Sequence, residues 1–137
     1  MFPELKQHHI GCLVESIDEF KIENENVWDA DKYSKTFFVS SQDVQVCFLQ
    51  MSSDTCLELV QPGTSNKPLS RLLSKSLTYY HIGFITRQFD DSVKRMIDSN
   101  YKLLSVFDSE AFGGKRCAFF YHPQIHLIEL IESDSEP

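Results

Sequence analysis

Two histidines and two glutamates recur at matching positions in the two halves of the chain. His9 begins a His-Ile-Gly triplet, and His81 begins the same triplet 72 residues later. Glu58 and Glu129 each stand inside a short apolar run and lie 71 residues apart. Two motifs displaced by nearly the same distance indicate an internal duplication. Each half therefore supplies one imidazole near its start and one carboxylate near its end.

Two imidazoles and two carboxylates suit a divalent first-row metal such as Mn, Fe, Co, Ni or Zn. If the halves pack about a pseudo-twofold axis, equivalent strands face each other and the four side chains converge. A buried carboxylate also needs a partner, because burying its charge costs on the order of several kcal/mol unless it is paired or bound to a cation. The alternative is an outward-facing Glu on a half-exposed strand, and a His that is hydrogen-bonded in the core or at the surface.

The remaining histidines match this pattern less well. His8 neighbours His9, but adjacent strand residues point to opposite faces, so both cannot bind one ion. His122 and His126 have the i, i+4 spacing of a helical chelate, yet Pro123 excludes a helix there. We expect these two to be turn and surface residues.

The chain reads as strand, helix and three strands, twice over. In the first half we expect a strand at 5–14, a short or frayed helix followed by a loop within 16–33, and three strands at 36–39, 44–51 and 55–60. In the second half the same order is expected at 78–86, 89–100, 101–106, 116–121 and 124–131. Phe89, Val93, Met96 and Ile97 fall on one predicted face of the second helix. Strand-dominated halves with one helix each indicate an α+β fold.

Size and charge restrict the function further. A chain of 137 residues with 42% hydrophobic residues fits one domain, which we divide into module one (5–60), a linker (61–77), module two (78–132) and an acidic tail (133–137). The net charge of −7 argues against nucleic acid as a partner. No apolar run approaches the roughly 20 residues of a membrane helix, and the first residues lack a signal-peptide pattern. We therefore expect a cytoplasmic protein with no membrane contact and with its four cysteines reduced.

The duplicated motifs resemble a known superfamily. The His-Ile-Gly openings, the Leu57–Leu59 and Ile128–Leu130 segments around the two glutamates, and the segment Ala111–Arg116 followed by His122-Pro123 are similar to the vicinal oxygen chelate superfamily. This group contains glyoxalases, bleomycin-resistance proteins and extradiol dioxygenases. The likeness extends over residues 5–132 and is strongest toward methylmalonyl-CoA epimerase and lactoylglutathione-lyase-like proteins.

The resemblance implies a fold, a cofactor and a reaction. It implies two βαβββ modules in tandem, which form a curled mixed sheet around a cavity where His9, Glu58, His81 and Glu129 hold a divalent ion of Co, Ni, Mn, Fe or Zn. Such ions stabilise the charge of an enediolate as a carbon acid loses its proton. Glu129 is the expected catalytic base. Family members often form homodimers, and the partner expected for this chain is a small-molecule substrate.

Two features bear on the substrate. The Gly113-Gly114 segment resembles a phosphate-binding loop only loosely, and we expect Phe112, Lys115 and Arg116 to contact an anionic substrate. The epimerases resembled carry a further catalytic Glu in the loop before the strand at 44–51. This chain has residues 40–43 there, where Asp43 is shorter and displaced by one or two positions, so a second base is an open question.

Three functions compete on this basis. The first is a metal-dependent isomerase, epimerase or lyase that abstracts a proton next to a carbonyl or thioester. The second is a metal-free binding protein of the bleomycin-resistance type, which sequesters an aromatic or cationic compound in an acidic cleft lined by rings such as Trp28, Phe37, Phe38, Phe112 and Phe119. The third is an interaction module with a vestigial site. Metal content and the effect of a chelator on ligand binding separate them.

Overall fold

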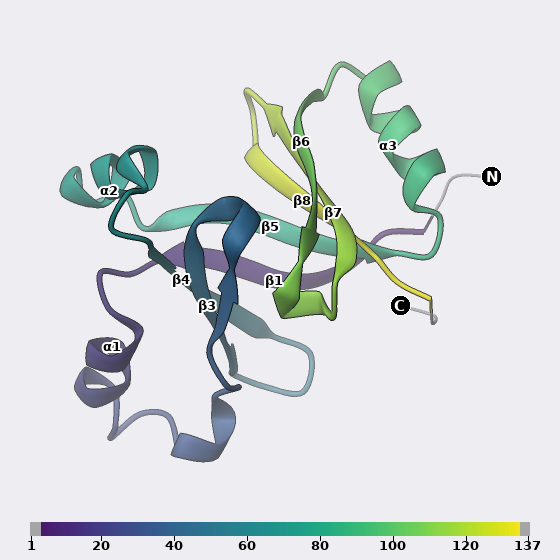
Figure 1. The fold of residues 1–137 in the computed structure, drawn as a ribbon. Coiled ribbons are helices and arrows are strands. Elements are labelled where there is room, and N and C mark those ends of the chain that lie inside the picture. Colours follow the sequence, from purple (N-terminus) through teal and green to yellow (C-terminus); the bar gives the residue numbers. More distant parts are fainter. Residues whose placement is uncertain (1–3, 135–137) are drawn as a thin grey trace. The chain divides into compact units, whose positions relative to one another are not determined.

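The predicted strand–helix–three-strand order is present in both halves of the chain (Figure 1). The structure is a computed structural model that describes residues 4–134; most of the predicted acidic tail lies outside the described residues. Two compact units are present, one of residues 9–80 and the other of residues 81–134 together with 4–8. The module and linker boundaries predicted from the sequence stay predictions.

The first half contains four strands and two α-helices. They are β1 (Lys6–Leu13), α1 (Ile17–Glu23), β2 (Phe37–Val39), β3 (Val44–Gln50), β4 (Cys56–Pro62) and α2 (Lys67–Ser74), with short 3₁₀ helices at Ala30–Lys32 and Ser40–Gln42. The strand order is β2-β3-β4-β1. β1 runs parallel to β4, whereas β2, β3 and β4 are antiparallel neighbours.

The second half repeats this arrangement with one helix. Its elements are β5 (Tyr79–Thr86), α3 (Phe89–Asp98), β6 (Lys102–Ser109), a 3₁₀ helix (Glu110–Phe112), β7 (Lys115–His122) and β8 (His126–Glu132). The order is β5-β8-β7-β6, with β5 parallel to β8 and the other pairs antiparallel. The same mixed order in both halves confirms the predicted α+β fold of tandem βαβββ modules.

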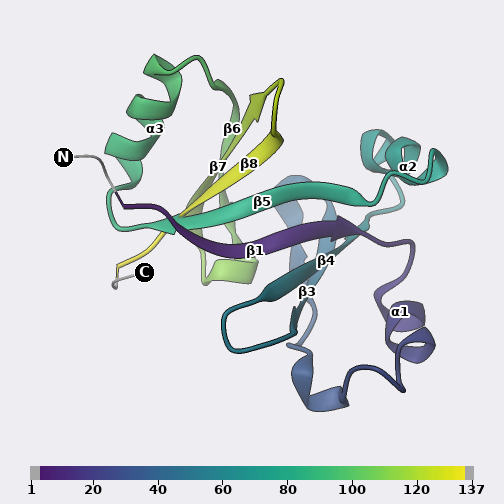
Figure 2. The same ribbon diagram turned by 180° about the vertical axis from the view of Figure 1, so that it is seen from behind.

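One face of the β7–β8 sheet forms the core under α3 (Figure 2). Phe120 and Leu130 are fully buried there, and Phe89 and Met96 of the helix pack against them. Ile97 does not join this core, because 47% of its side chain is exposed. At about 100° per residue it lies roughly 80° from Phe89, so of the four residues on the predicted face it stands at the margin.

The short helix and the following loop predicted within 16–33 are both present, with one 3₁₀ helix inside the loop. Ser16 caps α1 by accepting a hydrogen bond from the Glu19 backbone amide at 3.1 Å. The helix ends at Glu23, where the Asn24 side-chain amide donates to the Phe20 carbonyl oxygen at 2.9 Å. Polar residues that bond to the nearby backbone are poor helix interiors, and this accounts for the early end.

Two further expectations concern the whole chain. All four cysteines are free thiols, with Cys47 and Cys117 buried and Cys12 and Cys56 half-buried. Among residues 4–134 no helix combines the length and the apolar character that crossing a bilayer requires.

Candidate metal centre

The first half positions His9 and Glu58 on the same face of its sheet. Gly11 of β1 lies directly opposite Glu58 of β4, and His9 lies two residues earlier on the same face of its strand. His9 Nε2 and Glu58 Oε1 are 3.7 Å apart. The two residues expose only 0% and 5% of their surface. Their side chains form one buried imidazole–carboxylate pair.

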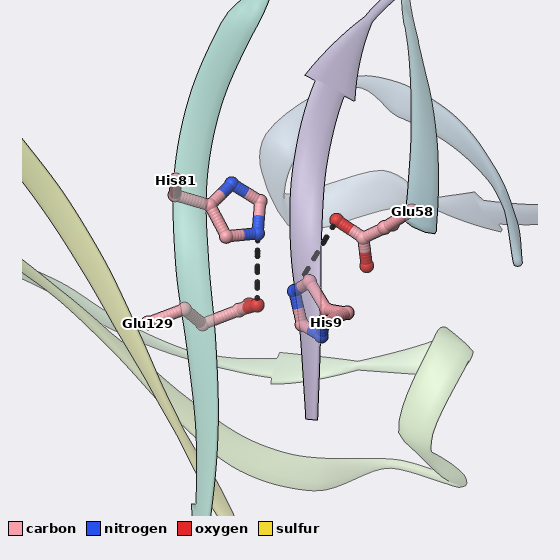
Figure 3. A group of neighbouring side chains, drawn as sticks. All are labelled: His9, Glu58, His81 and Glu129. Carbon is pink, nitrogen blue, oxygen red and sulfur yellow. Dashed lines mark ion pairs between the residues drawn. The ribbon is translucent and has the colours of Figure 1, made fainter. Parts of the chain in front are cut away.

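The second half repeats this pair in the same register. Gly83 of β5 lies opposite Glu129 of β8, and His81 lies two residues before the glycine. His81 Nε2 is 3.3 Å from Glu129 Oε1, and the two residues are 1% and 4% exposed (Figure 3). Because glycine has no side chain, each Glu has room to lean toward its His. The outward-facing alternative for the two glutamates is wrong.

Aromatic rings support both pairs. Phe48 lies directly opposite Glu58, with its ring centroid 5.9 Å from that of His9. Phe119 lies directly opposite Glu129, with its ring 5.2 Å from that of His81. Each pair therefore has an aromatic ring as a close neighbour, and apolar neighbours lower the local dielectric and strengthen electrostatic interactions.

A second ring lies behind each of these. Phe37 is 6.5 Å from Phe48, and Phe107 stacks on Phe119 at 5.5 Å with 20° between the planes. Sequence reasoning did not select Phe48 or Phe107 for the site. The signal was present, since Phe48 and Phe119 have the same 71-residue separation as the two glutamates.

The donor atoms fit a transition-metal ion. Imidazole nitrogens and carboxylate oxygens bind such ions at about 2.0–2.2 Å, so two adjacent ligands of one ion lie roughly 3.0–3.4 Å apart. The His81–Glu129 distance is in this range, and the His9–Glu58 distance exceeds it slightly. Each buried pair could therefore supply one imidazole and one carboxylate ligand to a divalent metal ion.

Arg116 lies on the other face of β7. It shares that face with Phe120, so its guanidinium is directed to α3 and away from Phe119. Its Nη1 donates to Asp90 Oδ1 at 2.9 Å and its Nη2 donates to Glu132 Oε2 at 2.7 Å. Hydrogen bonds to these carboxylates raise the pKa of Arg116, and Arg116 holds the pKa of Glu132 below its ordinary value.

Lys115 and Phe112 have different surroundings. Lys115 shares the Phe119 face of β7 and forms an ion pair with Asp134. The ring of Phe112 packs edge-on against His8 at 5.4 Å. Contact of these two residues, or of Arg116, with a substrate stays a prediction.

Asp43 lies far along the sheet from Glu58. It follows the 3₁₀ helix before β3 in a left-handed conformation with φ 51°, and its carbonyl oxygen accepts a hydrogen bond from the Gly63 amide at 2.9 Å. Gly63 is five residues beyond Glu58, about 16 Å at 3.3 Å per residue. This distance excludes Asp43 from direct contact with a substrate atom bound beside Glu58.

His122 and His126 border the last turn, as predicted. His122 Nδ1 accepts a hydrogen bond from the Gln124 amide at 3.1 Å, and its ring lies 4.7 Å from that of Tyr101. His126 has φ 61° and contacts Tyr121 by its ring edge. The positions of both histidines are explained by the geometry of the turn and by their contacts with tyrosine rings.

Tandem βαβββ modules with one buried His–Glu pair each define a class of metal-chelating folds. The model of the Glyoxalase/Bleomycin resistance protein/Dioxygenase superfamily matches residues 8–121, and the chain belongs to this superfamily. The family predicted from the sequence is thereby confirmed. A search of curated proteins found no match.

Solved structures share the whole fold at low sequence identity. A Streptomyces coelicolor methylmalonyl-CoA epimerase in complex with 2-nitronate-propionyl-CoA is 22% identical with a TM-score of 0.78, over 96% of this chain and 100% of that one. The Mycobacterium tuberculosis methylmalonyl-CoA epimerase is 18% identical with a TM-score of 0.77, over 96% and 89%. A hypothetical protein from Bacillus halodurans is 20% identical with a TM-score of 0.77, over 98% of both chains.

Proposed function

We propose that this protein is a divalent-metal-dependent isomerase, epimerase or lyase that removes a proton from the carbon next to a carbonyl or thioester. The observation that carries the proposal is the presence of a buried His–Glu pair in the same strand register in each half. An uncompensated buried carboxylate is costly, and two such pairs are better explained as ligands than as coincidence.

His9, Glu58, His81 and Glu129 would hold one ion together. The internal duplication supports this, because symmetric modules bring equivalent residues to a common axis. When bound, the ion supplies Lewis-acid stabilisation of charge on a substrate oxygen. Phe48 and Phe119, the rings next to the two pairs, would limit the access of water to such an ion.

Glu129 would act as the base. Its carboxylate is buried beside His81 Nε2 and directly across β7–β8 from Phe119, which places it to take a proton from a substrate atom at this site. Lys115 is on the same face of β7, four residues from Phe119 and about 13 Å along the strand. A substrate whose anionic end meets this ammonium would extend along β7 toward Glu129.

Acyl thioesters are the proposed substrate class, with 2-oxo compounds the next to be tested. The solved epimerase structures include complexes with 2-nitronate-propionyl-CoA and with methylmalonyl-CoA. Those ligands belong to those proteins. They motivate the choice because a coenzyme A thioester has both an acidic α-carbon and a long anionic tail.

Metal content is the first test. The full chain is purified without a His tag, its metals are measured by mass spectrometry, and its melting temperature is compared before and after chelation. We expect one equivalent of metal and a fall in Tm on chelation, because an ion bound only by the folded state stabilises it by roughly 2.7 kcal/mol at 100 times its Kd. Two equivalents would mean that each pair binds its own ion, and none would refute the metal site.

Proton abstraction is tested separately. Methylmalonyl-CoA is incubated with the metal-loaded protein in D₂O, and deuterium at the α-carbon is followed by mass spectrometry. Glu129→Gln should abolish the exchange, whereas Glu132→Gln, three residues on in the same strand, should retain it. Exchange that survives both chelation and Glu129→Gln would rule out this mechanism.

The four Phe rings favour a second candidate, a metal-free protein that sequesters aromatic compounds. In that case a planar aromatic ligand should bind with the same affinity with and without chelator, and Phe119→Leu should lower that affinity. Affinity that requires the metal would exclude this candidate.

Homodimer formation also stays a prediction, and sedimentation velocity measures it directly.

A further inference from the structure

The first module has a cavity bordered by α1. The residues of this helical segment that line it are Ser16, Glu19, Phe20 and Glu23. Their i, i+3, i+4 and i+7 spacing places them on one side of the helix, and Phe20 is the one apolar side chain among these four.

The cavity has a volume of about 550 Å³ and lies between α1, α2 and the sheet. Figure 2 shows the two helices on either side of the end of β1. The apolar part of its wall comprises Cys12, Leu13, Val14, Phe20, Leu57, Leu59 and Leu73. Leu57 and Leu59 flank Glu58 in β4 and point to the opposite face, so this cavity is separate from the His9–Glu58 pair.

Carboxylates surround the mouth of the cavity. Glu15, Glu19 and Glu23 line it at spacings of four residues, and all three side chains are exposed. None of the ion pairs formed within residues 4–134 involves them, and no lysine or arginine is among the described residues that line the cavity. The mouth is therefore negatively charged and the interior is apolar.

We propose that this cavity binds a small hydrophobic cation, an organic ammonium compound with an aliphatic body. A volume of this size is typical of small-molecule sites. Burial of the aliphatic part supplies the main free energy, and the three carboxylates select a positive charge over a neutral or negative one. This site is separate from the proposed metal chemistry, because neither His9 nor Glu58 lines the cavity.

The test uses the thiol of Cys12 as a reporter. Burial raises the pKa of this thiol, so alkylation by iodoacetamide is run at about pH 9 and is followed by peptide mass spectrometry. Octylammonium at about ten times its Kd should slow the alkylation of Cys12 about tenfold, because the occupied cavity excludes the reagent. 1-Octanol should protect more weakly and octanoate hardly at all. Cys56, on the opposite face of β4, serves as the internal control.

Two kinds of variant locate the site. Glu19→Gln combined with Glu23→Gln should weaken octylammonium binding about tenfold and leave 1-octanol binding unchanged, because each exposed pair contributes a modest factor. Asp18→Asn is the matched control, since Asp18 is an exposed carboxylate of the same helix that does not line the cavity. Leu73→Phe should weaken both compounds by filling the interior.

Three results would overturn the proposal. Equal protection of Cys12 by octanoate would remove the selectivity for cations. Unchanged octylammonium affinity in the double Gln variant would exclude the carboxylates. Alkylation of Cys12 that slows as protein concentration rises, without any ligand, would mean that a second copy of the chain covers the mouth.

Discussion

Phe119 lies directly across the β7–β8 pair from Glu129. The adjacent residue, Phe120, points to the opposite face and is fully buried under α3. One strand therefore supplies a ring to the candidate metal centre and a ring to the structural core at consecutive positions. This alternation makes it possible to separate effects on the site from effects on stability.

Phe119→Leu and Phe120→Leu should have different consequences. Both should lower the free energy of unfolding by about 1–2 kcal/mol, because each removes part of a buried ring. Only Phe119→Leu should also lower metal affinity, by about tenfold, since it loosens the surroundings of His81 and Glu129. Denaturant titration measures the first effect and competition with a metal indicator measures the second. An equal loss of metal affinity in both variants would contradict the assignment.

His9→Gln and His8→Gln form a second matched comparison. His9 is fully buried beside Glu58, whereas His8 is on the other face of β1 and contacts Phe112. His9→Gln should lower metal affinity by at least about 100-fold. His8→Gln should leave it within a factor of about two and change stability by roughly 0.5 kcal/mol or less.

The Arg116–Glu132 ion pair should make stability depend on pH. The pKa of Glu132 is lowered in the folded state by Arg116, so the pair contributes stability above the unfolded pKa of about 4.3 and loses it as pH falls through the folded pKa. Arg116→Met should therefore lower Tm at about pH 7 and have little effect at about pH 2. Lys94→Met, which removes an exposed pair with Asp98, should change Tm little at either pH. A constant difference across this range would argue against the ion pair as the cause.

Two isoleucines of α1 test how the short helix is held. Ile17 is buried against Cys47 and Leu59, and Ile22 is 65% exposed. Ile17→Ala should cost about 2–4 kcal/mol of unfolding free energy. Ile22→Ala should stay within about 0.5 kcal/mol of the parent. Chemical denaturation of both variants, analysed with a common m-value, measures these two changes in unfolding free energy.

Much of the fold was predictable because the duplication is visible in local patterns. Strands with alternating apolar residues, the helix at Phe89 and the turn at Pro123 follow from short-range preferences that neighbouring residues share. The repeat itself identified His9, Glu58, His81 and Glu129 as candidate ligands, because each His and each Glu recurs at nearly the same spacing in both halves. The early end of α1 was visible as a weak signal in its polar residues.

Other features depended on contacts between residues distant in sequence. The burial of Glu58 and Glu129 required β1 and β5 to pair in parallel with β4 and β8, which placed a glycine opposite each carboxylate. The direction of Arg116 followed from strand register, because a one-residue shift would have turned it to the other face. The distance from Asp43 to Glu58 followed from the pairing of β3 with β4. The sequence by itself determined the elements and the repeated donors. Only the tertiary structure decided which face each side chain occupies and that a cavity lies under α1, because both depend on the packing of distant segments.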